Sequence, residues 1–319
     1  MCTALSYPGN RHYFGRNLDL EYAYREEVVV TPRNYPFVFR CGAALQNHYA
    51  MIGMATISEG YPLYYDATNE QGLSIAALNF PGNAKYLPKT SNFDNIAPFE
   101  LIPWVLGQCK STEDAQKLLT QVNVWHLPFS RKFPLSPLHW IISDKQESIV
   151  VEPMNNGLQI YKNPVGILTN SPPFPYHLLH LADYAGLRAE ESANLFQEYG
   201  IQRYSNGMGA LGLPGDFSSS SRFVKAAFVT QNSILDGSEV NQFFHLLACV
   251  AMPSGSIRID GKNEITRYSS CCDTASGIYY YTTYENCRIT AIDMQKCPLD
   301  GSNLIPYPLR DRLDIRFEN

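Results

Sequence analysis

Short apolar stretches separated by Gly, Pro and Asn fill the first 80 residues, a pattern typical of β-strands joined by turns. The stretches are too short for helices and are rich in β-branched and aromatic residues. We expect strands at Thr3–Ser6, Tyr13–Leu18, Glu27–Thr31, Met51–Ile57 and Leu73–Leu78. The N-terminal quarter of the chain is therefore predicted to be almost entirely β.

Helical periodicity follows this β-rich part. Apolar residues recur at helical spacing in Pro98–Cys109 and Thr112–Val122, and Ser111 or Thr112 can cap the second helix. The Pro- and aromatic-rich stretch Trp125–Pro137 has neither a helical nor a strand period. We interpret it as a loop, a kind of segment that often carries binding function.

The second half of the chain groups its elements in the same way. Strands are predicted at His139–Ser143, Ile149–Glu152 and Leu158–Tyr161, helices at Phe174–Ala185, Arg222–Gln231 and Glu239–Val250, and final strands at Arg267–Cys272, Gly277–Thr283 and Arg288–Asp293. Because strands come in runs with helices grouped between them, the pattern indicates an α+β layered fold rather than alternating βαβ units. No linker or repeat interrupts it, so we expect one domain over residues 1–319.

Composition and charge exclude several classes of protein. The chain is 45% hydrophobic and 17% charged, as in globular proteins. A net charge of −5 without any Lys/Arg run argues against nucleic acid or an anionic membrane as partner. No stretch approaches the roughly 18 apolar residues of a membrane span, and no signal-peptide segment is present. We therefore expect a cytoplasmic protein.

The eight cysteines are interpreted as free thiols, because a cytosolic protein is kept reduced. The adjacent pair Cys271 and Cys272 should point to opposite faces of a strand. No Cys-x-x-Cys is present, and the His177-x-x-His180 pair lacks a third ligand, so both histidines are interpreted as structural. No metal is expected.

One motif imitates a cofactor site. Gly207-Met-Gly-Ala-Leu-Gly212 matches the dinucleotide fingerprint, but Pro214 and Gly215 follow at once and prevent the helix that this fingerprint requires. We interpret Asn206–Asp216 as a plain glycine-rich loop. Gly-x-Ser-x-Gly is missing, so an α/β-hydrolase elbow has no support. No organic cofactor is expected.

The start of the chain suggests a different chemistry. Loss of Met1 would give Cys2 both a thiol and a free α-amine, whose unperturbed pKa values are about 8.5 and about 7.7–8.0. The amine can then accept the thiol proton, so that one residue supplies nucleophile and base.

Arg16 and Asp19 could support this chemistry. A cation lowers the pKa of a nearby thiol, and a carboxylate orients an amine; the alternative is a surface ion pair. Residues three apart face opposite sides of a straight strand, so both reach Cys2 only if the strand bends or ends after Arg16.

Six separated segments resemble the choloylglycine hydrolases, a family that includes bile salt hydrolases and penicillin V acylases. They are Cys2, Tyr13–Asp19, Ala77–Gly82, Leu168–Pro172, Gly212–Asp216 together with Ser221–Phe223, and Tyr281–Asn286. The resemblance runs from residue 1 to about residue 310. It implies a four-layer αββα sandwich of the N-terminal-nucleophile hydrolase type, commonly a homotetramer, that cleaves an amide without metal or organic cofactor.

The resemblance also implies roles for individual residues. Cys2 would be the nucleophile and its amine the base, Asp19 the carboxylate that holds the amine, Arg16 the cation beside the thiol, Asn79 and Asn170 parts of the oxyanion hole, and Arg222 the second active-site arginine. An amide N–H at a developing oxyanion stabilises the tetrahedral intermediate. Without the resemblance, Asn170 before Ser-Pro would be interpreted as an Asx turn.

The segment Asn79-Phe-Pro-Gly82 is similar to the bile salt branch, whereas penicillin V acylases often carry Tyr at the position of Asn79. We therefore expect conjugated bile acids as substrates. A steroid needs an apolar wall, for which the candidates, each equally compatible with ordinary core, are Leu20, Tyr24, Tyr65, Phe129, Phe133 and Leu135. The alternatives are penicillin V, an N-acyl homoserine lactone, or an inactive protein that binds amphipaths.

Overall fold

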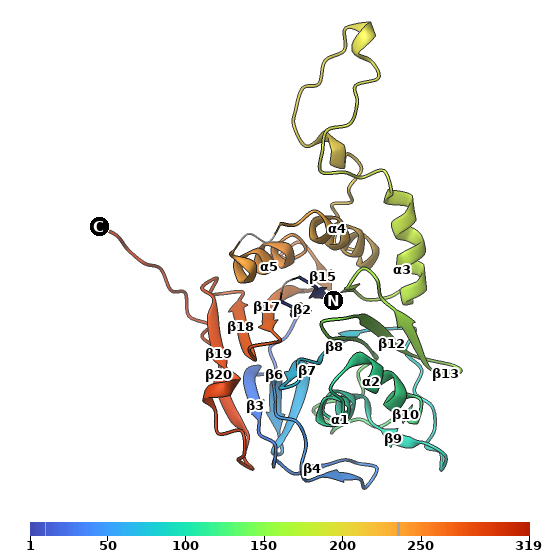
Figure 1. The fold of residues 1–319 in the computed structure, drawn as a ribbon, viewed down its shortest axis with the longest axis vertical. Coiled ribbons are helices and arrows are strands. Elements are labelled where there is room, and N and C mark those ends of the chain that lie inside the picture. The colour runs from blue at the N-terminus through green and yellow to red at the C-terminus, as the bar shows by residue number, and fades with distance from the viewer. Residues whose placement is uncertain (10, 235–236) are drawn as a thin grey trace.

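Two antiparallel sheets lie face to face in the middle of the molecule (Figure 1). The computed structural model describes residues 1–9, 11–234 and 237–319. The six-stranded sheet has the order β14 (Ile167–Leu168), β1 (Cys2–Tyr7), β2 (Tyr13–Leu20), β17 (Ile265–Asp273), β18 (Ile278–Thr283) and β19 (Thr290–Asp293). The eight-stranded sheet has the order β13 (Gly157–Lys162), β12 (Ser148–Met154), β11 (Leu138–Ser143), β8 (Ser74–Asn79), β7 (Tyr61–Asn69), β6 (Met51–Ser58), β3 (Glu27–Thr31) and β20 (Ile305–Pro308).

Helices cover the outer face of each sheet. Helices α1 (Leu101–Gln108) and α2 (Thr112–Leu119) pack on the eight-stranded sheet, and α4 (Ser219–Gln231) and α5 (Glu239–Ala248) pack on the six-stranded sheet. Helix α3 (Phe174–Leu181) lies against α4. The order helix, sheet, sheet, helix is the four-layer αββα sandwich that the resemblance implies.

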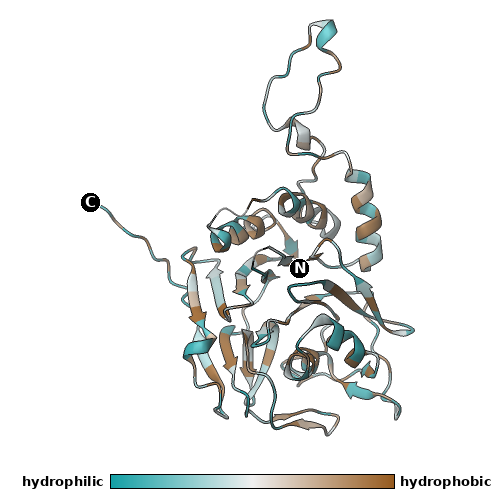
Figure 2. Ribbon diagram, in the orientation of Figure 1, coloured by the Kyte–Doolittle hydropathy of each residue, from teal (hydrophilic) through white to brown (hydrophobic). Residues whose placement is uncertain are grey.

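Two clusters of buried apolar residues hold these layers together. The first fills the space between the sheets and continues beneath α4 and α5, and the second lies between the eight-stranded sheet and α1 and α2. Figure 2 shows hydrophobic residues along the strands of both sheets and on helix α1. Since both faces of each sheet are covered, a central strand such as β2 is buried over nearly its whole length instead of alternating.

The remaining elements are short. Two-residue or three-residue strands are β4 (Phe37–Val38), β5 (Ala44–Leu45), β9 (Asp94–Ile96), β10 (Val122–Val124), β15 (Arg258–Ile259) and β16 (Lys262–Asn263). Single 3₁₀ turns are η1 (Pro98–Glu100), η2 (Ala182–Tyr184), η3 (Gln197–Tyr199), η4 (Met208–Ala210) and η5 (Met294–Lys296). Trp125–Pro137 is a loop, as predicted, and Asn206–Asp216 is a loop that contains η4.

The sequence predictions were wrong at several element ends and for one long strand. The helix predicted to reach Val122 ends at Leu119, because Val122 begins strand β10, which pairs with β9. The helix predicted to reach Ala185 changes to a 3₁₀ turn after Leu181. Strand β7 was not predicted, because a β-bulge within it disturbs its alternation.

Two segments project from the sandwich. Residues 186–215, between α3 and α4, form a long excursion at the top of Figure 1, and residues 309–319 extend outward at the left of this view. In the described part of the chain, no helix combines the length and apolar character needed to cross a membrane.

Candidate active site

Cys2 begins strand β1 and lies at a cavity between the two sheets. It pairs with Leu18 of the neighbouring strand β2, and its side chain is only 3% exposed. The cavity has a volume of about 420 Å³, and Arg16 and Asn79 line it together with Cys2. A thiol, a guanidinium and an amide are thus brought together from strands β1, β2 and β8.

Arg16 extends from β2 toward the eight-stranded sheet. Its Nη1 donates to the carbonyl oxygens of Tyr65 at 2.9 Å and Ala77 at 2.5 Å. Burial lowers the pKa of Arg16, but the neighbouring Cys2, Tyr268, Asp66 and Asp19 raise it, and the net result is a pKa above its usual value. The guanidinium is therefore a permanent cation beside the thiol.

Asp19 lies on the opposite face of the same strand. Strand β2 runs without interruption to Leu20, so no strand end follows Arg16. Arg16 and Asp19 instead approach the start of the chain from the two faces of the sheet. Thr266 donates to Asp19 Oδ1 at 2.6 Å, and the Met1 amino group donates to the Asp19 carbonyl oxygen at 2.8 Å. Burial raises the pKa of Asp19, while Arg222, the amino terminus, Thr266 and Arg16 lower it.

Asn170 connects three parts of the site. Its Oδ1 accepts hydrogen bonds from the Cys2 backbone N–H at 2.9 Å and from Arg222 Nη2 at 2.7 Å. Its Nδ2 donates to the carbonyl oxygen of Asn79 at 2.7 Å. The orientation of the amide follows from these partners, because both groups that meet Oδ1 can only donate.

Arg222 comes from the first turn of α4 and is 1% exposed. Its Nη1 donates to the Cys2 carbonyl oxygen at 2.5 Å and to Thr3 Oγ1 at 2.6 Å. Burial lowers its pKa, and the nearby Asp19 and Cys2 oppose that effect. The Ser218 hydroxyl accepts from the Ser221 N–H at 3.3 Å and so caps the helix that presents Arg222.

The predicted wall residues all line the cavity that contains Cys2. They are Leu20, Tyr24, Tyr65, Phe129, Phe133 and Leu135. The ring centroids of Tyr24 and Phe133 lie 6.0 Å apart, and those of Phe129 and Phe133 lie 6.2 Å apart. Among the described residues that line the cavity, Arg16 has the one cationic side chain. The wall is therefore mostly apolar and aromatic, with Arg16 near Cys2 and Glu21 as a carboxylate in the lining.

Several residues of the site carry no sequence signal. Glu264 is fully buried and pairs with the Met1 amino group, and Asp66 is buried close to Arg16. His177, which we interpreted as structural, donates from Nε2 to the Asn170 carbonyl oxygen at 2.9 Å. A single Glu, Asp or His in a strand or helix has many possible roles, and only the packing shows which one applies.

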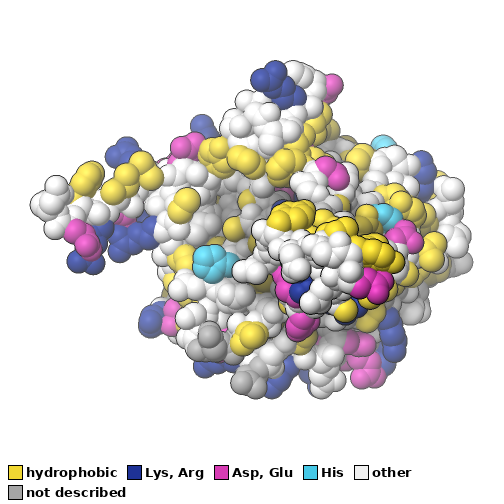
Figure 3. All heavy atoms as spheres, turned by 90° about the horizontal axis from the view of Figure 1, so that it is seen from above, with side chains coloured by type: hydrophobic (Ala, Val, Ile, Leu, Met, Phe, Trp, Pro, Cys, Tyr) yellow, Lys and Arg dark blue, Asp and Glu magenta, His cyan; other side chains and the backbone are white. Residues whose placement is uncertain are grey.

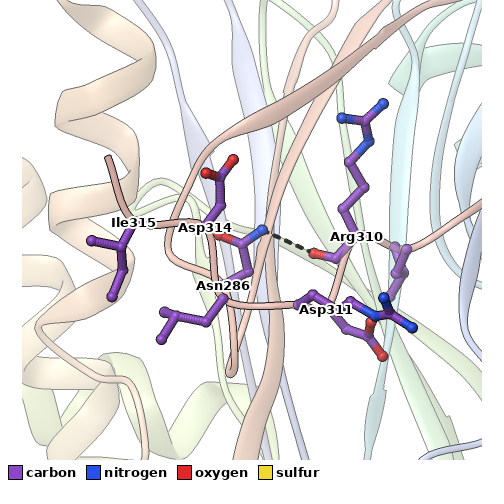
Figure 4. A pocket seen from close by; sticks show the side chains of 8 residues that line it. Asn286, Arg310, Asp311, Asp314 and Ile315 are labelled. Atoms are coloured by element: carbon purple, nitrogen blue, oxygen red, sulfur yellow. Dashed lines mark hydrogen bonds between the residues drawn. The ribbon is translucent and has the colours of Figure 1, made fainter. Parts of the chain in front are cut away.

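A second hollow, of about 500 Å³, lies where the C-terminal segment leaves the sheets (Figure 4). Asn286 and residues 309–315 line it, and Asn286 Nδ2 donates to the Arg310 carbonyl oxygen at 3.2 Å. These residues include no thiol, hydroxyl or imidazole, so the cavity at Cys2 is the better candidate site. Among residues 1–9, 11–234 and 237–319, no three His, Cys, Asp or Glu side chains are grouped to hold a metal ion.

Comparisons with known proteins agree over nearly the whole chain. The choloylglycine hydrolase family of linear amide C–N hydrolases matches residues 2–307. A "bile salt hydrolase/transferase" of Lactiplantibacillus plantarum is 50% identical over 315 residues and covers 97% of each chain. One of the same description from Clostridium perfringens is 39% identical over 329 residues and covers 100% of both chains.

Solved structures give the same result for the fold. The crystal structure of a variant of conjugated bile acid hydrolase from Clostridium perfringens has a TM-score of 0.93 at 38% identity and covers 100% of both chains. Penicillin V acylase from Agrobacterium tumefaciens has a TM-score of 0.74 at 20% identity, covering 98% of this chain and 94% of that one, which is a likeness of fold alone.

Proposed function

Because this chain belongs to the choloylglycine hydrolase family of linear amide C–N hydrolases, we propose that it hydrolyses the amide bond of glycine- or taurine-conjugated bile acids, with Cys2 as the nucleophile. One observation carries the proposal. The Cys2 thiol lies beside the buried Arg16 at a cavity of about 420 Å³ whose other walls are mostly apolar and aromatic. The descriptions of the relatives support bile acids over other amides.

Loss of Met1 completes the nucleophile. While Met1 is present, the nitrogen of Cys2 is an amide and cannot act as a base. After its loss the amine keeps Asn170 Oδ1 as an acceptor for one N–H, which orients its lone pair. Asp19 pairs with Met1 through its backbone, and in this proposal its carboxylate stabilises the protonated amine.

The reaction then takes two steps. The Cys2 thiol transfers its proton to the α-amine, and the thiolate attacks the amide carbonyl carbon. The oxyanion receives N–H donation from the Asn79 side chain, which lines the cavity. Collapse breaks the C–N bond, the ammonium protonates the departing glycine or taurine, and a thioester remains. Water, deprotonated by the amine, cleaves the thioester and releases the bile acid and the free thiol.

Asn170 has a different part from Asn79 in this proposal. Its Oδ1 is occupied by Cys2 and Arg222, and one Nδ2 hydrogen is given to the Asn79 backbone. It therefore holds the amine and the Asn79 segment in place, in addition to any contribution of its second Nδ2 hydrogen to the oxyanion hole that the resemblance implies.

The decisive experiment measures free glycine and taurine released from conjugated bile salts, beside phenoxyacetate released from penicillin V. Wild type, Cys2→Ala and the matched control Cys287→Ala are compared, since Cys287 is an exposed free thiol. We expect bile salt cleavage in wild type and Cys287→Ala and its loss in Cys2→Ala. Cleavage of penicillin V alone would assign the chain to the acylase alternative. Binding of bile salts without any cleavage would favour the inactive amphipath-binding protein, and cleavage of N-acyl homoserine lactones alone would favour that substrate.

The chain is also proposed to form a homotetramer. The excursion of residues 186–215 exposes large apolar side chains, which include Leu195, Phe196, Tyr199, Ile201, Tyr204 and Leu211. The view from above in Figure 3 shows hydrophobic side chains on the part of the molecule that projects toward the viewer. Exposed apolar surface of this kind typically marks an interface. A second copy of the chain is the partner that the family resemblance suggests.

A cytoplasmic location is proposed as well. All eight cysteines have free thiols, although two of them, Cys271 and Cys272, are adjacent in the buried strand β17. Free thiols in this number are typical of a reducing compartment. Fractionation of producing cells would test it, and recovery of the protein outside the cell membrane would contradict it.

A further inference from the structure

The six catalytic residues predicted from the sequence include two arginines, both buried, but only one carboxylate, that of Asp19. Arg16, Arg222 and Asp19 are all at most 1% exposed. Burying a charge without a counter-charge is costly, so a second anion is expected close to this group. Two further buried carboxylates are present: Glu264 pairs with the Met1 amino group, and Asp66, which is 2% exposed, lies on the Arg16 side.

A β-bulge places Asp66 there. In the pairing of β6 with β7, Met54 lies opposite Asp66 and Ala55 lies opposite Tyr64, so Tyr65 has no partner. A bulge of this kind turns two consecutive side chains toward one face of the sheet. Tyr65 and Asp66 therefore both face the six-stranded sheet: Tyr65 lines the Cys2 cavity, and Asp66 contacts Tyr268 and Tyr279.

Arg16 binds next to this bulge. Pairing between β7 and β8 ends at Asp66 and Ala76, so Tyr65 and Ala77 are not paired with each other across these two strands, although Ala77 still pairs with Trp140 of β11. Arg16 Nη1 donates to the carbonyl oxygens of both Tyr65 and Ala77. Within the described part of the chain Arg16 donates only to backbone carbonyls, and its Nη2 has no hydrogen-bond partner. Its charge is thus balanced by nearby anions rather than by a direct ion pair.

Two tyrosines donate hydrogen bonds to Asp66. Tyr268 of β17 and Tyr279 of β18 each donate from the hydroxyl to one carboxylate oxygen of Asp66, both at 2.7 Å. Burial raises the pKa of Asp66 above its usual value, and Arg16 and the two hydroxyls oppose this rise by favouring the ionised form. Cys272 is the other titratable group close to this carboxylate.

We propose that Asp66 is a positioning residue for amide cleavage: it offsets the charge of Arg16 and thereby sets how strongly this cation stabilises the Cys2 thiolate. The inference rests on the proposed function of Cys2. The charges that face Arg16 are Cys2, Asp66 and Asp19, together with the phenol of Tyr268, and Arg222 faces Cys2 and Asp19 from the helix side. Arg16 and Arg222 thus face the carboxylates of Asp66 and Asp19, and Glu264 pairs with the amino terminus beside them. Transfer of the thiol proton to the amine leaves the net charge of this group unchanged.

The test is the variant Asp66→Asn, in which the amide oxygen can still accept from one tyrosine and the amide NH₂ can donate to the hydroxyl oxygen of the other. The readout is the pH dependence of Cys2 alkylation by iodoacetamide, followed by mass spectrometry of the N-terminal peptide. Without the negative charge of Asp66, the positive charge of Arg16 stabilises the Cys2 thiolate more strongly. Half-maximal alkylation therefore moves to lower pH by about one unit. An unchanged or higher midpoint in the folded variant overturns the proposal.

Two further variants separate charge from structure. Asp273→Asn is the control, because Asp273 is another carboxylate that is 2% exposed and lies on the same strand as Tyr268. Asp273 pairs with Arg11 at the far end of β17, so this variant should leave the alkylation midpoint unchanged. An equal shift in this control would contradict the proposal. Tyr279→Phe removes one hydrogen-bond donor to Asp66 and so favours the neutral form of this carboxyl. The alkylation midpoint should therefore move to lower pH, by less than in Asp66→Asn. If Asp66→Asn does not fold, the result for Tyr279→Phe tests the proposal in its place.

The two proposals fail in different ways. Turnover that survives Cys2→Ala rejects Cys2 as the nucleophile whatever the alkylation profile shows. Loss of turnover in Cys2→Ala together with an unshifted profile in Asp66→Asn rejects only the role of Asp66. A purely structural Asp66 would lower the free energy of unfolding without moving the alkylation midpoint.

Discussion

His177 lies beneath the active site, where it is fully buried and stacks on Phe223 at a centroid distance of 4.9 Å. Its Nε2 donates to the carbonyl oxygen of Asn170, which fixes the neutral tautomer with the proton on Nε2. Burial lowers the pKa of His177 from 6.5 to about 4. Burial, and not the hydrogen bond to Asn170, therefore disfavours the charged form of this imidazole.

This residue makes the stability of the protein depend on pH. The unfolded chain binds a proton at His177 below pH 6.5, whereas the folded chain does so only below about pH 4. The stabilisation is thus present above pH 6.5 and is lost as the pH falls to about 4, by about 3 kcal/mol for this one group. Urea unfolding at pH 7 and pH 4.5 measures it. The decrease should be smaller in His177→Gln, and an equal decrease in both proteins would contradict the argument.

Asn79 should act on the transition state rather than on substrate binding. Its side chain lines the cavity next to Cys2, and its backbone is held by Asn170. We expect Asn79→Ala to lower kcat roughly 100- to 1,000-fold with little change in KM, as for loss of one oxyanion donor. Asn92→Ala, at an exposed position, is the control and should leave both constants unchanged. A rise in KM at constant kcat would assign Asn79 to substrate binding instead.

At the scale of elements, the position of Arg16 depends on the close approach of β2 and β17. Gly15 precedes Arg16, and a Cβ placed on Gly15 would lie 1.9 Å from the carbonyl oxygen of Ser270. Neither strand can move away, because β2 also pairs with β1 and β17 also pairs with β18. The absence of a side chain at Gly15 is therefore a requirement of the sheet that carries Cys2 and Arg16.

Gly15→Ala is accordingly expected to destabilise the fold by at least about 2 kcal/mol, the scale of overpacking in a buried region. Chemical denaturation measures the change, and turnover of the folded fraction should fall as well, since Arg16 moves with the strand. Gly215→Ala is the matched control, because a Cβ there meets no atom within 4 Å. Equal stability of the two variants would show that the sheet adapts.

At the scale of the whole molecule, the sandwich and the excursion have separate tasks. The core cluster between the sheets joins residues from Cys2 to Leu299, and we propose on this basis that the chain is one domain. The excursion of residues 186–215 contributes little to that core: of its side chains, Tyr204 is 87% exposed and Leu195 is 78% exposed. Its length is explained if it contacts another copy of the chain.

The triple variant Leu195→Ser, Phe196→Ser and Tyr204→Ser should therefore shift the proposed tetramer toward smaller species and leave the thermal stability of the protomer nearly unchanged. Analytical ultracentrifugation measures the mass. Phe93→Ser, which changes an exposed Phe elsewhere, is the control and should remain tetrameric. A triple variant with wild-type mass would place the interface on another surface.

The sequence by itself determined the class of fold and the type of chemistry. Short apolar runs and helical periods report local backbone geometry, and they predicted most of the long strands and helices. The pairing of a thiol with a possible α-amine at Cys2 is contained in one residue, and the resemblance of six segments added the family, now confirmed by the match over residues 2–307. The residues proposed for the substrate wall line the cavity at Cys2, although the pattern alone did not distinguish wall from core.

Only the tertiary structure decided which atoms meet. Strand β7 and the bulge at Tyr65 were missed because a bulge breaks the period by which strands are recognised. The contacts of Asn170 with Cys2 and Arg222 join residues 168 and 52 positions apart, which no local pattern reports. Asp66 carried no signal at all, because an isolated aspartate in a strand gains its role only when sheet packing brings it close to Arg16.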